Sequence, residues 1–120
     1  MKTVKIISSS HPSLVINAGL CDTFYTKFMG FMFRKQIDPF YGLLFSESTE
    51  SKVNTSIHMF FMNFDLTVLW LNKDYAVVDK VIARKWHPVY VSKQPAQYTL
   101  EMHRDRYQNF EIGDKLEVAS

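Results

Sequence analysis

The chain is poor in the residues and patterns that mark many protein classes. It has one cysteine, Cys21, in 120 residues, which excludes an internal disulfide framework and a zinc site built from several cysteines. Its longest apolar runs, 57–62 and 66–71, are far shorter than the roughly 20 residues of a membrane-spanning helix. The formal net charge of +2 is too small to indicate nucleic acid or a membrane as the partner.

Hydrophobic and aromatic residues, by contrast, are plentiful. They make up 47% and 15% of the chain, which excludes disorder. The length is that of one domain, and no repeat or linker divides the sequence, so we expect a single domain over residues 1–120. The N-terminus has no apolar stretch of the roughly 7–15 residues found in a secretory signal. We therefore expect a cytoplasmic protein.

Alternation of apolar and polar residues with period two dominates the chain. This pattern predicts seven or eight short strands at nearly even spacing, which is typical of a closed or nearly closed sheet. We predict a mainly β (α+β) fold, a small β-barrel-like or strongly curved sheet with one covering helix. The predicted strands lie at 4–6, 14–16, 43–45, 57–62, 66–71, 76–83, 98–103 and 115–118.

One segment has helical spacing instead. Apolar residues at positions 24, 28, 31 and 32 form one face of a helix that would begin near Asp22 or Thr23, either of which can cap it. Gly30 fits this pattern only where another backbone approaches closely or where the helix ends. Arg34 would suit the negative C-terminal end of the helix. We expect the helix to cover one opening of the sheet.

Two connections are longer than usual. Residues 46–56 are polar and predict a mobile surface loop. Residues 84–97 contain Trp86, His87 and two prolines, and a loop of this kind is either a lid or binding loop, or a wall packed against the barrel. Basic and aromatic residues alternate around Trp86, a pattern that also suits the binding of single-stranded nucleic acid by stacking.

Three polar residues are candidates for chemistry. Arg34 follows the apolar helix, where its guanidinium could hold a carboxylate or phosphate; the alternative is a helix C-cap paired with a surface acid. Glu101 and His103 share one face of one predicted strand, where a carboxylate beside an imidazole could act as a general base. The alternative for this pair is an ordinary solvated strand face.

His58 and Cys21 complete the candidates. With Glu101 and His103, His58 would supply a set of two histidines and one carboxylate for a metal, but the spacing does not bring the three together, so we predict no metal site and no cofactor. Cys21 lies at the predicted helix start, where a thiolate is favoured; the alternative is inert packing.

Five blocks in order resemble the prokaryotic domain-of-unknown-function family 192. The blocks are Gly30-Phe31-Met32-Phe33-Arg34, Gly42-Leu43-Leu44-Phe45, Ile57–Met62, Leu66–Asn72, and the pair Leu100-Glu101 and Ile112-Gly113-Asp114. The resemblance covers about residues 20–118. It implies a β-rich fold with one helix in a small bacterial or archaeal protein, and it implies no particular reaction.

The chain departs from the family's pattern at the start of the strand 66–71. The resemblance predicts Pro-Ile-Asp or Pro-Leu-Asp there, whereas this chain has Asp65-Leu66-Thr67. A site that depends on that aspartate would be altered by Thr67, and Asp65 lies two residues earlier as a substitute.

We predict a binding module for a small molecule or a protein partner. Its ligand-binding residues would be Arg34, His58, Trp86 and Glu101, close to the 84–97 loop. The first alternative is a small hydrolase-like enzyme with Glu101 or His103 as base, and the second is a module that binds single-stranded RNA. The chain has no phosphate-binding loop, nucleophile elbow, zinc-protease helix or Cys-x-x-Cys motif.

Overall fold

A computed structural model describes residues 2–120. Seven strands form one sheet in the order β5-β4-β6-β3-β2-β1-β7, which confirms the predicted fold class. The strands are β1 (Thr3–Ser8), β2 (His11–Cys21), β3 (Tyr41–Ser51), β4 (Leu66–Leu71), β5 (Val77–Ala83), β6 (Ala96–His103) and β7 (Leu116–Ala119). The helices are α1 (Phe24–Met29) and the 3-10 helix η1 (Arg104–Asn109). No helix within these residues is long and apolar enough to cross a membrane.

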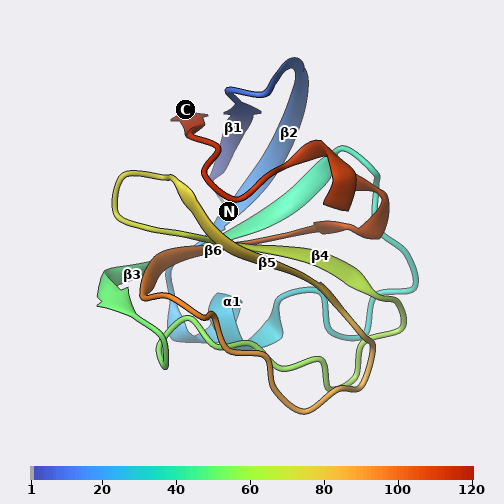
Figure 1. The fold of residues 1–120 in the computed structure, drawn as a ribbon. Coiled ribbons are helices and arrows are strands. Elements are labelled where there is room, and N and C mark those ends of the chain that lie inside the picture. The colour runs from blue at the N-terminus through green and yellow to red at the C-terminus, as the bar shows by residue number, and fades with distance from the viewer. Residues whose placement is uncertain (1) are drawn as a thin grey trace.

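The sheet curls into a half-barrel. Its only parallel pairing among the named strands joins β2 to β3, and the other neighbours are antiparallel. The two edges of the sheet approach each other at one point beside β5 and β7. There Ala76 bridges to Lys115 and the Val77 N–H donates to the Asp114 carbonyl at 2.8 Å. In Figure 1, β1 and β2 lie on one side of the central strands, and α1 lies on the other.

Each face of the sheet carries its own apolar cluster. The concave face is closed by β1, β2 and β7 and packs side chains such as Ile6, Leu69 and Leu100, each 0% exposed. The opposite face, called here the covered face, lies under α1 and the connections 30–40, 52–65 and 84–95. Its cluster includes Phe31, Met62 and Trp70. Alternation along β6 sends Leu100 to the concave face and Glu101 to the covered face.

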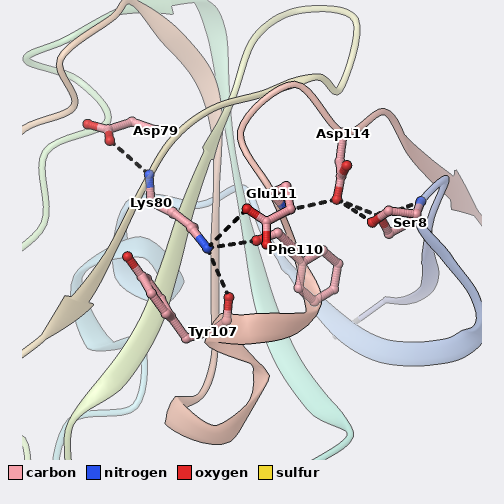
Figure 2. Close-up of polar contacts among 8 residues, drawn as sticks. Ser8, Asp79, Lys80, Tyr107, Phe110, Glu111 and Asp114 are labelled. Carbon is pink, nitrogen blue, oxygen red and sulfur yellow. Dashed lines mark hydrogen bonds and ion pairs between the residues drawn. The ribbon is translucent and has the colours of Figure 1, made fainter.

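Two polar clusters hold the end of the half-barrel where β5 meets β7 (Figure 2). The Lys80 ammonium group donates to the carbonyls of Tyr107 and Phe110, at 3.2 and 2.9 Å, and lies 4.0 Å from the centre of the Tyr107 ring. The Asp114 carboxylate accepts hydrogen bonds from Ser8, Ser10 and the Glu111 N–H. These contacts tie η1 and the chain after it to the strands.

Two predicted segments, a strand and a loop, differ from the structure. The predicted strand at 57–62 is wrong, since Ile57 alone forms a β-bridge there, an isolated one with Tyr90. Phe61 adopts a φ of 61°, which breaks an extended path. The alternation there arises because the segment lies over the sheet and buries Met59 and Met62. The predicted loop at 46–56 is half strand, because β3 continues to Ser51.

The helix is shorter than predicted. Thr23 caps α1, and its hydroxyl accepts from the Thr26 N–H in a capping box. The helix ends at Gly30, whose φ of 46° favours glycine. The predicted stripe is wrong in two ways: Phe28, inside the helix, is 54% exposed, and the buried Phe31 lies beyond the helix end. The helix lies over the covered face of the sheet, on the side away from β1 and β2 (Figure 1).

Candidate functional site

A cavity of about 110 Å³ lies between α1 and the covered face of the sheet. Thr99 and Glu101 on β6 and Phe45 on β3 form its floor. One wall is the end of α1 with the residues that follow it, and the other wall is the segment 54–58. The lining is Lys27, Phe28, Met29, Gly30, Phe31, Met32, Phe45, Glu47, Asn54, Thr55, Ser56, Ile57, His58, Met62, Thr99 and Glu101.

Glu101 is the distinctive group of this cavity. It lies on a central strand between Leu43 of β3 and Val68 of β4, and it is only 6% exposed. Within residues 2–120 its carboxyl group has no hydrogen bond and no ion pair. Burial without a compensating partner raises the pKa of Glu101 from 4.5 to about 8. The carboxyl group is therefore mostly protonated at neutral pH.

Two glycines bring backbone close to Glu101. A Cβ atom on Gly30 would lie 3.4 Å from Oε1 of Glu101 and 3.5 Å from the Phe45 ring. A Cβ atom on Gly42 would lie 2.7 Å from the Glu101 carbonyl oxygen, which is closer than real atoms approach. The glycines at the heads of two sequence blocks therefore make room around the same residue.

His58 lines the same cavity. Its Nδ1 accepts a hydrogen bond from the Phe60 N–H at 3.2 Å, so the neutral ring carries its proton on Nε2. The ring packs against Phe28 and Phe60, with centroid distances of 5.7 and 5.6 Å. The structure thus brings together two of the predicted site residues, His58 and Glu101.

The wall formed by 54–58 is fastened to the floor. The Thr55 carbonyl accepts hydrogen bonds from Nε1–H of Trp70 at 2.8 Å and from the Thr99 hydroxyl at 3.4 Å. The backbone of Ile57 pairs with Tyr90 in both directions. The 84–97 loop is therefore a wall that supports the segment 57–62 from outside, and it does not line the cavity itself.

An ion pair stands among the more exposed lining residues. The Lys27 ammonium on α1 lies 2.8 Å from the Glu47 carboxylate on β3, with side-chain exposures of 29% and 19%. Because the pair is partly exposed, water screens it and its contribution to stability is small. Its position joins the helix to the sheet beside the cavity.

Arg34 lines a neighbouring pocket with Cys21, Met32 and other residues. It lies five residues beyond the end of α1, so the helix C-cap alternative is wrong. Its guanidinium lies 5.3 Å from the centre of the Phe31 ring, and no acid pairs with it in the part of the chain that the structure describes. Burial, followed by the nearby Glu101 carboxylate, raises the pKa of Cys21 to about 12, so this buried thiol is inert packing.

His103 lies apart from Glu101, although both are on the same face of β6. It lines another pocket with Asp65 and Arg104. Its Nδ1 accepts from the Asp105 N–H at 3.0 Å and so caps η1. Within residues 2–120, no group of three or more His, Cys, Asp and Glu side chains has the arrangement of a metal site.

Trp86 belongs to an exposed aromatic cluster made by Phe33, Phe61 and Trp86. The ring centroids of Phe33 and Phe61 are 5.1 Å apart, and those of Phe61 and Trp86 are 5.2 Å apart. All three residues have φ between 61° and 67°, a strained conformation for large side chains. Trp86 is 53% exposed and does not reach the Glu101 cavity.

Thr67 points away from the cavity. It is fully buried on the concave face, opposite Met102, and its hydroxyl donates to the Arg104 carbonyl at 3.0 Å. The departure from the family's pattern at this position therefore leaves the Glu101 cavity unchanged. Sequence reasoning missed Thr55 and Thr99, and no sequence signal links a loop carbonyl to a strand hydroxyl 44 residues away.

The comparisons with known proteins agree with the family resemblance of the five sequence blocks. The chain matches the domain-of-unknown-function family 192, described as "Uncharacterized ACR", over residues 5–118. It belongs to this family. A UPF0127 protein of Pyrococcus furiosus is 38% identical over 104 residues, which cover 85% of this chain and 86% of the relative. A UPF0127 protein of Thermococcus kodakarensis is 43% identical over 82 residues, 68% of this chain and 50% of that protein.

Two crystal structures share the fold. A protein of Sinorhizobium meliloti, described as a candidate transcription regulator, superposes with a TM-score of 0.84 at 22% identity, covering 97% of this chain and 92% of its own. A protein of unknown function from Novosphingobium aromaticivorans gives 0.81 at 19% identity, covering 96% and 83%. At these identities the likeness shows the fold alone, so the function has to be argued from the site of this chain.

Proposed function

We propose that this protein is a binding module for a small molecule, which it holds in the Glu101 cavity. The observation that carries the proposal is the carboxyl group of Glu101, which is nine-tenths buried, faces the cavity and has no partner within residues 2–120. An unpaired polar group in an apolar site lowers stability. A ligand that pairs with this group would restore the missing interaction.

The positions of the sequence blocks support this site. Four of the blocks that carry the family resemblance supply lining residues, although they are far apart in the sequence. They contribute Gly30, Phe31 and Met32; Phe45; Ile57, His58 and Met62; and Glu101. A packing role alone would not require a carboxylic acid at the point where these blocks meet.

The two alternatives receive less support from the geometry. For a small hydrolase-like enzyme with Glu101 or His103 as base, the two candidate bases line different pockets, so they cannot act on one substrate together. Binding of single-stranded nucleic acid needs a positively charged groove beside exposed rings. The rings of Phe33, Phe61 and Trp86 are exposed, but the chain's net charge of +2 is small. A cytoplasmic location remains part of the proposal, and cell fractionation tests it.

A fragment screen by NMR tests the proposal. The probes are amines, carboxylic acids, amides and alcohols of up to about eight non-hydrogen atoms. This size suits the cavity of about 110 Å³, because a protein cavity of about 150 Å³ accepts benzene. We expect saturable shifts of backbone amide signals in the segments 28–32, 55–58 and 99–101. Glu101→Gln should weaken these shifts. Its matched control, Glu111→Gln, removes an exposed carboxylate and should leave them unchanged. Absence of any saturable shift in these segments contradicts the proposal.

A further inference from the structure

We infer that the ligand of the Glu101 cavity is a small organic cation, an alkylammonium ion whose charged head lies against the Glu101 carboxylate and whose alkyl part packs on the rings and thioethers of the walls. This inference rests on the proposed function and names the chemical class of its ligand. It comes from the charges around the cavity, the chemistry of its lining and its size.

The charges that face Glu101 leave a place for a cation. On α1, Lys27 is already paired with Glu47 of β3 at 2.8 Å. Arg34 opens into the neighbouring pocket, where its guanidinium lies over the Phe31 ring. Cys21 of β2, which lines the neighbouring pocket, is a protonated thiol. His58 of the segment 54–58 is the remaining titratable group that lines the cavity. An anionic ligand would meet the Glu101 carboxyl group with no unpaired cation of the described residues beside it, whereas an ammonium ion would pair with the ionised Glu101 carboxylate.

The lining suits an organic cation better than a metal ion. Phe28, Phe31 and Phe45 line the space, and the faces of phenylalanine rings attract ammonium groups. Three methionines supply polarisable thioethers. A metal ion would need several oxygen, nitrogen or thiolate ligands at once, and the described residues contain no such group.

The state of Glu101 makes the inference testable by pH. With a pKa of about 8, the free protein has roughly one tenth of its Glu101 ionised at pH 7 and nine tenths at pH 9. A cation binds the ionised form, so its association constant should rise about tenfold over this interval. An alkylamine has a pKa near 10.4, like lysine, so the probe stays charged throughout.

The experiment titrates the protein with n-butylammonium chloride, n-butanol and sodium butyrate at pH 7 and pH 9, following backbone amide signals. We expect butylammonium to bind about ten times more tightly at pH 9 and to release close to one proton per molecule at pH 7, measured by calorimetry in two buffers. Glu101→Gln should lose this binding and its pH dependence. Glu111→Gln should keep both.

The outcomes separate the inference from the proposed function. Binding of butanol or butyrate at the same amide signals, with affinity that falls from pH 7 to pH 9, overturns the cation and leaves a small-molecule site. Failure of all three probes and of the fragment panel overturns both. If Glu101→Gln does not fold, the pH dependence in the unaltered protein decides, because butylammonium binding that is equal at pH 7 and pH 9 contradicts the inference.

Discussion

The two faces of the sheet are closed in different ways. The concave face is enclosed by β1, β2 and β7, and the strand ladders satisfy the backbone groups of its walls. The covered face lies under a helix of six residues and three irregular connections. Its cover contains the strained residues Phe33, Phe61 and Trp86, and only this side encloses a buried carboxyl group without a partner, Glu101, in the described chain.

The difference shows where this fold has room for a binding site. A wall made of paired strands can change little, because a shift of register turns every side chain to the other face. A wall made of loops can be reshaped around a ligand while the sheet stays fixed. Glu101 combines the two, since it projects from a rigid central strand into a space whose other walls are loops.

The largest expected effect is a loss of stability with rising pH that depends on Glu101. The pKa of Glu101 is raised to about 8 in the folded chain from 4.5, so its contribution to stability is complete below pH 4.5 and is lost as the pH rises through 8. The free energy of unfolding should fall by on the order of 5 kcal/mol over this interval. Urea unfolding at a series of pH values should show this slope, and Glu101→Gln should remove it. An equal slope in both proteins contradicts the burial argument.

Cavity-forming substitutions should cost more on the concave face. Leu100→Ala removes a fully buried side chain between paired strands, and we expect a loss of about 3–4 kcal/mol. Met62→Ala on the covered face should cost about 2 kcal/mol, because the segment 57–62 is a loop outside the strand ladders and can move inward. Guanidinium unfolding measures both values. A Met62→Ala loss as large as that of Leu100→Ala would show that the loop cover is as rigid as the strands.

Lys80→Met should weaken the end of the half-barrel. The substitution removes an ammonium group that donates to the carbonyls of Tyr107 and Phe110, and hydrogen bonds to charged groups are each worth about 1.5–3 kcal/mol. We expect a loss of about 3 kcal/mol, the lower bound for two such hydrogen bonds, with unchanged fragment binding at the Glu101 cavity. Thermal unfolding and the NMR screen test the two parts, and lost fragment binding would mean that the two faces are coupled.

The smallest effect concerns Asp114 and has the opposite slope in pH. Partial burial raises the pKa of Asp114, but hydrogen bonds from Ser10, the Glu111 N–H and Ser8 outweigh it and lower the pKa below 3.8. Its contribution is therefore present above pH 3.8 and is lost as the pH falls through the lowered value. Asp114→Asn should cost less than about 1 kcal/mol at pH 7, and the two proteins should become equal in acid. A difference that persists at pH 2 would assign the effect to packing.

The sequence predicts the strands better than their cover. A run that is apolar on both faces identifies β4, and alternation identifies β6, because each residue in these strands faces one of two layers. The same alternation at 57–62 predicts a strand that does not form, since a loop lying flat on a sheet also buries every second or third residue. The helix stripe fails after Gly30 for a related reason, because Phe31 is buried by a turn that no period describes.

The sequence predicts the candidate site only in part. Parity places Glu101 and His103 on one face, but burial depends on what covers each residue, and the cover leaves His103 beside η1 while it encloses Glu101. Arg34 and His58 reach neighbouring pockets through loop conformations that single residues determine, such as the positive φ of Gly30. The absence of a partner for Glu101 is a property of the folded structure, and no local sequence pattern predicts it.

The most direct test of this account is the pKa of Glu101 in the ligand-free protein. It can be measured by following the side-chain carboxyl carbon in NMR spectra between pH 3 and pH 10, with Glu101→Gln to assign the signal. The account predicts a midpoint near 8, together with responses of neighbouring amide signals in the segments 28–32 and 55–58. A midpoint near the ordinary value of 4.5 would contradict it, because the carboxyl group would then be solvated or paired and the cavity would lack the feature on which its function is argued.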